Sequence, residues 1–172
     1  MVFAPSPQLT ITIEQLGERP DVHLHPGGQG VWQARMITSL GVSVKLCAAL
    51  GGEIGRVLGP LIEAEGIGLQ VVDGHSSSGV YVHDRQGGKR AVIAENPGEP
   101  LARHDVDELY GIALTEGLRA DVSLLSGPTT EEIVDADTYR RLAGDLNRNG
   151  KRVIADLAGP FLNCVLEGGV TF

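Results

Sequence analysis

The regular alternation of strand-like apolar runs with amphipathic helices constrains the fold of this chain more than any other feature. In its second half, the chain changes repeatedly between the two patterns. The segments are, in order, His104–Leu118, Asp121–Ser126, Ala136–Asn149, Arg152–Asp156 and Gly159–Glu167. Strands that alternate with helices form parallel sheets, because each helix returns the chain to the start of the next strand. The sequence therefore predicts an α/β domain.

The first half contains the same alternation together with several shorter strand-like segments. Helices are predicted at Val31–Leu40 and Arg56–Glu65, each followed by a glycine, which is a common residue at helix ends. Between them, Ser43–Leu50 is almost continuously apolar, as expected of a strand covered on both faces. The segments with a pattern of shorter strands are Leu9–Ile13, Val22–His25, Gly68–Val72, Ser78–Asp84 and Lys89–Glu95. The last two are joined by Arg85-Gln86-Gly87-Gly88, which predicts a hairpin and a separate, antiparallel layer.

Composition excludes several classes of protein. A net charge of −8 disfavours nucleic acid as a partner, because lysine and arginine supply most of the affinity for phosphate backbones, although a small anionic ligand needs only a few local donors. No run approaches the roughly 18 apolar residues that a membrane helix requires, and no basic and apolar leader opens the chain. Two cysteines do not indicate a disulfide framework. We expect a cytoplasmic protein that binds neither nucleic acid nor membranes.

Glycine-rich turns precede the first two predicted helices. His25-Pro26-Gly27-Gly28-Gln29-Gly30 leads directly into a helix, where glycines allow close approach of a ligand and the helix N-terminus offers free N–H groups. A tight structural turn is the alternative interpretation of this segment. Gly51-Gly52-Glu53-Ile54-Gly55 differs in spacing from the dinucleotide-binding fingerprint and is interpreted as a structural turn.

Taken in order, these motifs resemble those of the PfkB-type (ribokinase-like) carbohydrate kinases, nearest to the 1-phosphofructokinase and tagatose-6-phosphate kinase branch. The motifs here are PGGQGVWQAR, LGGEIG, ENPG, LSGPTT and ADLAG, and the resemblance extends from about Pro5 to the last residue. It implies a three-layer α/β/α domain with a small β-sheet lid. The lid would comprise strands at about residues 8–25 and 68–95, and the core residues 26–66 and 101–172.

The resemblance also implies an activity and its cofactors. Such enzymes transfer the γ-phosphoryl group of ATP to a sugar or sugar-phosphate hydroxyl with the aid of Mg²⁺. Their nucleotide site and catalytic aspartate belong to a C-terminal GAGD segment that this sequence does not contain. Ala143-Gly144-Asp145 is similar to it but lies inside a predicted amphipathic helix, so we assign no catalytic residue. Val170-Thr171-Phe172 looks like the start of another strand. We therefore expect a truncated domain that is inactive by itself. An unpaired strand edge in the lid hairpin favours a homodimer formed through the lid.

Several substrate-binding positions implied by the resemblance carry different side chains here. Gln29 and Trp32 replace a lysine and an asparagine, Thr10 replaces an aspartate, and Ser78 replaces an arginine that would meet a substrate phosphate. Serine cannot reproduce the bidentate recognition of phosphate by arginine, so these replacements predict altered specificity or loss of binding. The full set of candidate substrate-binding residues is Thr10, Gly27, Gly28, Gln29, Gly30, Trp32, Ser78 and Asn96.

Two interpretations of the function remain open. The chain is either the sugar-binding portion of a carbohydrate kinase or a non-catalytic ligand-binding or assembly protein with a kinase-like fold. His23 and His25 lie two residues apart, as two metal ligands on one strand would, but no third ligand has a suitable spacing. We therefore predict no metal site within these residues.

Overall fold

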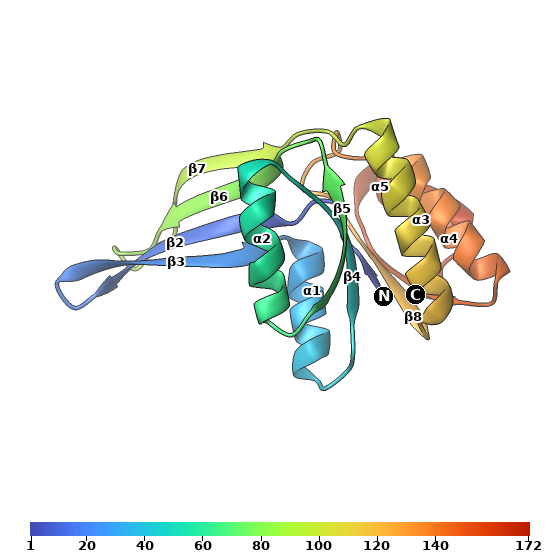
Figure 1. Ribbon diagram of the computed structural model, residues 1–172, viewed down its shortest axis with the longest axis horizontal. Helices are drawn as coiled ribbons and strands as arrows, with labels where there is room; N and C mark the ends of the chain where they lie inside the picture. Colours follow the sequence, from blue (N-terminus) through green and yellow to red (C-terminus); the bar gives the residue numbers. More distant parts are fainter.

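A five-stranded parallel sheet forms the centre of the computed structural model, which describes residues 1–172 (Figure 1). Its strand order is β5-β4-β1-β8-β9. The strands are β1 (Val2–Phe3), β4 (Lys45–Gly51), β5 (Gly68–Gly74), β8 (Val122–Ser126) and β9 (Arg152–Asp156). The helices are α1 (Gln29–Ser39), α2 (Gly52–Ala64), α3 (Arg103–Arg119), α4 (Ala136–Arg148) and α5 (Gly159–Gly168). The predicted α/β class and parallel sheet are confirmed.

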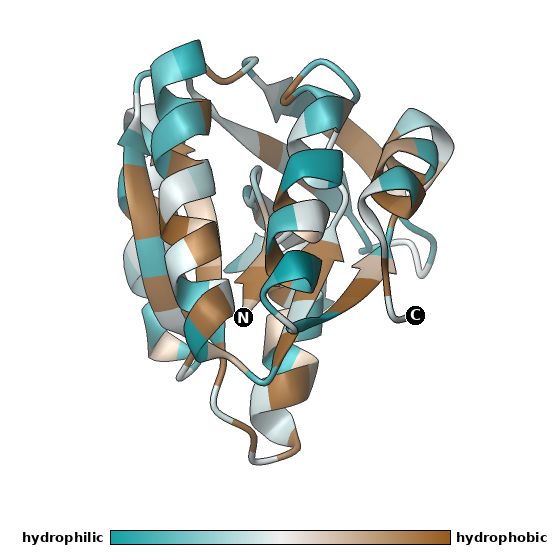
Figure 2. Ribbon diagram, turned by 90° about the vertical axis from the view of Figure 1, so that its right-hand side faces the viewer, coloured by the Kyte–Doolittle hydropathy of each residue, from teal (hydrophilic) through white to brown (hydrophobic).

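The helices cover the two faces of this sheet and create a separate apolar core on each. Phe3 and Cys47 face the core formed with α3, α4 and α5, whereas the neighbouring Val2 and Leu46 face the core formed with α1 and α2. Figure 2 shows the hydrophobic residues concentrated along the strands and the hydrophilic ones on the outer turns of the helices. Alternate residues of a strand point to opposite faces, so strands covered on both sides are apolar throughout. No helix is both long enough and apolar enough to cross a membrane.

A second, four-stranded sheet extends away from the helices and forms the lid (Figure 1). Its strand order is β3-β2-β6-β7. The strands are β2 (Gln8–Leu16), β3 (Arg19–Gly27), β6 (Ser78–Asp84) and β7 (Ala91–Gly98). The hairpin predicted at Ser78–Glu95 forms β6 and β7, which pair antiparallel. The β2–β6 pair, by contrast, is parallel, so the lid is a mixed sheet.

At Gly68–Gly74 the structure differs from the predicted division of the chain into core and lid. This segment, expected in the lid, is the edge strand β5 of the large sheet and pairs in parallel with β4, with Leu46 opposite Leu69. Leu69 and Val72 pack against the two apolar cores, which explains why β5 lies under the helices. The second part of the lid therefore begins at Ser78. Val170–Phe172 forms no regular strand, but Thr171 N donates to Val153 O at 2.7 Å and so holds this segment beside β9.

Candidate functional site

The turn between β3 and α1 brings the backbone unusually close to neighbouring segments. A Cβ atom on Gly27 would lie 2.3 Å from Thr10 Oγ1, and one on Gly30 would lie 2.3 Å from Ala4 Cβ. Gly28, which precedes the helix, has a φ of 95° and therefore favours glycine. No side chain caps α1, so the N–H groups of its first turn are free of side-chain partners. The glycines are thus required by the packing, and they leave an uncapped helix N-terminus.

This helix N-terminus borders a hollow of about 230 Å³ that contains three of the predicted site residues. Gly28, Gln29 and Gly30 form one wall, and the loops after β1 and β8 contribute Ser6 and Thr129. Thr129 N donates to Ser6 Oγ at 2.9 Å, which holds the two loops together. Ligands of α/β sheets usually bind beside the carboxyl ends of the strands, and the hollow lies there.

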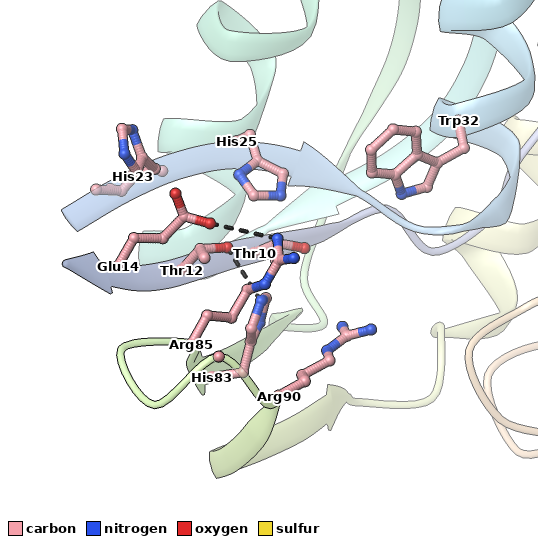
Figure 3. Close-up of a pocket in the computed structure, with 11 residues that line it drawn as sticks. Thr10, Thr12, Glu14, His23, His25, Trp32, His83, Arg85 and Arg90 are labelled. Carbon is pink, nitrogen blue, oxygen red and sulfur yellow. Dashed lines mark hydrogen bonds and ion pairs between the residues drawn. The ribbon is translucent and has the colours of Figure 1, made fainter. Parts of the chain in front are cut away.

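A larger cavity of about 790 Å³ lies against the lid (Figure 3). Of the predicted residues it contains Thr10 and Trp32. The polar or charged residues that sequence reasoning did not assign to a substrate site are Thr12, Glu14, His23, His25, His83, Arg85 and Arg90. Strand pairing explains the grouping, because Thr10 lies opposite His25, and Thr12 lies opposite both His23 and His83. Residues directly opposite each other project from the same face of a sheet.

His83 is the most buried charged or ionisable residue of this cavity, with 5% of its surface exposed. Its Nε2 atom lies 3.2 Å from Thr12 Oγ1, and its Nδ1 atom is buried without a hydrogen-bond partner. Burial lowers the pKa of His83, and the nearby Arg90 and Arg85 lower it further. Burial also lowers the pKa of His25, with a further contribution from Arg35. Both rings therefore favour the neutral form.

The two arginines of the cavity differ in their partners. Arg85 Nη1 lies 3.3 Å from Glu14 Oε1, in an exposed ion pair between the hairpin and β2. The guanidinium carbon of Arg90 lies 4.7 Å from the centre of the Tyr81 ring, and Arg90 forms no ion pair. Cation–π contacts position a guanidinium without neutralising it, so Arg90 keeps its full charge.

Trp32 forms another wall of the cavity and is held in place by its neighbours. The guanidinium of Arg35 lies 4.0 Å from the centre of the indole ring and is itself fixed by two hydrogen bonds to Glu65, at 2.8 and 2.6 Å. His25 packs edge-on, with 6.4 Å between ring centres. Trp32 nevertheless remains 54% exposed. A fixed, exposed aromatic ring beside polar groups is suited to contact with the apolar face of a sugar.

Three predicted residues remain. Gly27 ends β3 against Thr10, and Ser78 and Asn96 have local partners outside the two cavities. Ser78 Oγ accepts a hydrogen bond from Gly51 N at 3.0 Å, which ties the lid to the turn before α2. Asn96 Oδ1 accepts one from Gly98 N at 3.0 Å. The structure thus divides the candidate residues among the hollow at α1, the lid cavity and local contacts outside both.

The residues with possible metal or catalytic roles also have structural partners. Asp145 lies in α4 and accepts hydrogen bonds from Tyr110 and Arg148. His23 Nε2 lies 3.0 Å from Asp21 Oδ2. No three of the histidine, cysteine, aspartate and glutamate side chains are grouped as a metal site would require.

A three-layer α/β/α domain with a β-sheet lid is the architecture of the ribokinase-like sugar kinases, and the comparison with solved structures confirms this fold. A possible 1-phosphofructokinase from Thermotoga maritima superimposes with a TM-score of 0.83 at 18% identity, over 98% of this chain and 56% of that one. Phosphofructokinase-2 from Escherichia coli, solved in complex with substrates and products, gives 0.81 at 22% identity, over 98% and 57%. A putative phosphofructokinase from Staphylococcus aureus gives 0.80 at 16% identity, over 99% and 57%.

The resemblance inferred from the motifs is thus confirmed at the level of the fold. No family model matches the sequence. The chain spans just over half the length of the phosphofructokinases that it resembles.

Proposed function

We propose that this chain is the sugar-binding portion of a PfkB-type carbohydrate kinase, which transfers the γ-phosphoryl group of ATP to a sugar or sugar-phosphate hydroxyl. One observation carries the proposal. The uncapped N-terminus of α1 meets the carboxyl ends of β1 and β8 under a lid whose polar face lines a cavity. The similarity in fold to phosphofructokinases supports it. We place this protein in the cytoplasm.

The chain's own residues would bind and orient the sugar. The backbone N–H groups at Gly28 and Gly30 would donate to hydroxyls, and Thr10 would bind a further hydroxyl beside Gly27. The Trp32 ring would pack on the face of the sugar. ATP would supply the phosphoryl group and Mg²⁺ would neutralise its charge. We assign no transfer step to the residues of this chain.

Fluorescence offers a direct test, because Trp32 is the only tryptophan of the chain. Titration with hexoses, pentoses, hexose phosphates and nucleosides should change its emission for at least one class of sugar. Gln29→Ala should weaken that binding, and Met36→Ala, one helical turn beyond Trp32 on α1, is the matched control. A complete panel without binding, confirmed by calorimetry, would contradict the proposal. Phosphoryl transfer is tested with the product of the complete reading frame.

A non-catalytic, kinase-like binding protein is the second candidate. The local hydrogen bonds of Ser78 and Asn96 favour it, because each side-chain oxygen already accepts a hydrogen bond from a backbone N–H group. Phosphoryl transfer by the product of the unmodified reading frame would exclude this candidate. If transfer appears only after Gln29→Lys and Trp32→Asn are introduced together, the second candidate is correct.

We also propose that two copies of the chain pair through the lid. The register of β2, β3 and β6 places Ile11, Ile13, Val22 and Val82 on the face opposite the histidines. Val22 is 53% exposed there, and the edge strands β3 and β7 are largely exposed. Exposed strand edges favour association with another chain. Sedimentation should detect a dimer that Val22→Lys weakens and Val57→Lys, on exposed α2, does not.

A further inference from the structure

Two short segments connect the large sheet to the lid strands β6 and β7, and hydrogen bonds tie the two together. The outgoing segment comprises residues 75–77 and the returning segment residues 99–102. Ser77 N donates to Glu99 Oε2 at 2.8 Å, and Glu99 N donates to Ser77 O at 3.0 Å. Ser76 Oγ donates to Pro100 O at 2.6 Å. The two segments therefore form one connected unit, which we call the lid joint.

The backbone around the lid joint is packed too closely to accommodate side chains. A Cβ atom on Gly51 would lie 2.2 Å from Ser76 O, and one on Gly79 would lie 2.7 Å from Pro97 O. Gly98 has a φ of 94°, a conformation that favours glycine. The joint, the ends of the two lid strands and the turn before α2 thus pack backbone against backbone.

Asp105, in the first turn of α3, holds the lid joint from the side of the large sheet. It is 1% exposed, its Oδ2 atom accepts from His75 N at 3.0 Å, and its Oδ1 atom lies 3.2 Å from His75 Nδ1. Burial by itself would raise the pKa of Asp105, but the hydrogen bonds from His75 hold it below its ordinary value. Because a buried charge is costly unless it is paired, this carboxylate depends on His75. The buried charge is thus directed at the residue where the chain leaves the sheet for the lid.

We propose that Asp105 is a positioning residue, which fixes β6 and β7 relative to the large sheet and so maintains the geometry of both cavities. Asp105 and His75 line neither cavity. The hairpin that they hold, however, contributes His83 and Arg85 to the lid cavity and Glu95 to the hollow at α1. A displaced hairpin would alter both cavities at once. The positioning rests on these contacts alone, and only its consequence for ligand binding rests on the proposed function.

Hydrogen–deuterium exchange of the chain, followed by mass spectrometry, tests the positioning without any ligand. Asp105→Ala removes both contacts to His75. We expect the amides of the lid joint and of β6 to exchange about 10- to 100-fold faster, because one hydrogen bond to a charged group changes an opening equilibrium by about this factor. Exchange in α4 and α5 should not change. Asp105→Asn should have a smaller effect, since its amide oxygen can still accept from His75 N.

The matched control is Asp107→Ala, which removes the same charge from an exposed position two residues further along α3 and should leave exchange in the lid unchanged. Val165→Ala, at a fully buried position of α5, supplies the exchange pattern of a general loss of stability. Circular dichroism establishes that each variant is folded. If Asp105→Ala does not fold, Glu99→Ala tests the same joint from the returning segment, because it removes the acceptor of Ser77 N.

Faster exchange in β6 with unchanged exchange in α4 and α5 would support the positioning role. Unchanged exchange, acceleration confined to residues 75–77, or the uniform acceleration expected of Val165→Ala would overturn it. A repeat with saturating fructose 6-phosphate separates this proposal from the proposed function. A ligand that binds the positioned lid should slow the exchange of β6 in Asp105→Ala. If Asp105→Ala accelerates exchange and no sugar or sugar phosphate slows it, the positioning role stands and the sugar-binding function fails.

Discussion

Replacement of Gly30 by alanine tests the close packing that places the N-terminus of α1. The added Cβ would lie 2.3 Å from Ala4 Cβ, 3.3 Å from Ala4 Cα and 3.2 Å from Ser126 Oγ. Carbon atoms in contact prefer about 3.5–4.0 Å, so α1 and the segment after β1 must separate by more than about 1 Å. Ala4 has no flexible side chain that could move aside. The strain therefore falls on the backbone.

The expected cost is the difference between two effects. Overpacking of a buried site costs about 1–3 kcal/mol, and alanine in a helix regains about 0.5–1 kcal/mol relative to glycine. We expect Gly30→Ala to lower the free energy of unfolding by about 1–2 kcal/mol, and a chain of this size loses about 2–4 °C in Tm for each kcal/mol. Urea and thermal unfolding followed by circular dichroism measure both quantities.

Gly111→Ala is the matched control for this prediction. Gly111 lies on the exposed face of α3, and a Cβ there would have no heavy atom within 4 Å. The same substitution should therefore stabilise the chain, by about 0.5–1 kcal/mol. If Gly30→Ala raised the Tm as much as Gly111→Ala does, the packing argument for the PGGQG turn would be refuted.

Three further predictions concern buried polar and ionisable groups. Tyr139 is fully buried and donates to Ser126 O at 2.7 Å, so Tyr139→Phe should lower the free energy of unfolding by about 1–2 kcal/mol in urea titrations. Burial and nearby arginines lower the pKa values of His25 and His83, so the unfolded chain takes up protons first as the pH falls below about 6.5. Stability should therefore decrease from pH 7 to pH 5, and the double variant His25→Gln/His83→Gln should show a smaller decrease. Burial raises the pKa of Cys47 to about 12, so a thiol reagent should label it only on unfolding, as peptide mass mapping would show.

The sequence predicts the helices and the long strands closely, because their periodicity is local. The predicted strand Arg152–Asp156 has the same bounds in the structure, and the helix predicted at Gly159–Glu167 differs by one residue. β1 could not be predicted in this way. It contains only Val2 and Phe3, too few residues to show a period, and yet it is the central strand of the large sheet.

Which strands pair with each other is harder to predict from the sequence than where the strands lie. Gly68–Val72 has the pattern of a strand, but nothing local indicates that it pairs with β4 and not with the lid. The parallel pairing of β2 with β6 is equally hidden, because the two strands lie far apart in the chain. Such pairings depend on which apolar faces the helices cover, which is a property of the whole domain.

Prediction of the candidate site from the sequence has the same limit. The glycines of the α1 turn are recognisable as a motif, and the structure gives Gly27 and Gly30 contacts that exclude any side chain. The lid cavity has no such motif, because its residues come from alternate positions of strands that pair only in the fold. The available signals were Thr10-x-Thr12-x-Glu14 and His23-x-His25, each of which places polar residues on one face of a strand.

This alternation gives the lid two faces with different chemistry. Thr12, His23 and His83 project towards the cavity, whereas Ile11, Ile13 and Val82 occupy the adjacent register on the other side. Near the core the apolar face packs against α2, and towards the hairpin it is progressively exposed. A one-residue slip in the pairing would exchange the two faces, so the register that creates the cavity also exposes the apolar surface. The proposed ligand binding and the proposed self-association would thus use the same strands but opposite side chains, so single substitutions should alter one without the other.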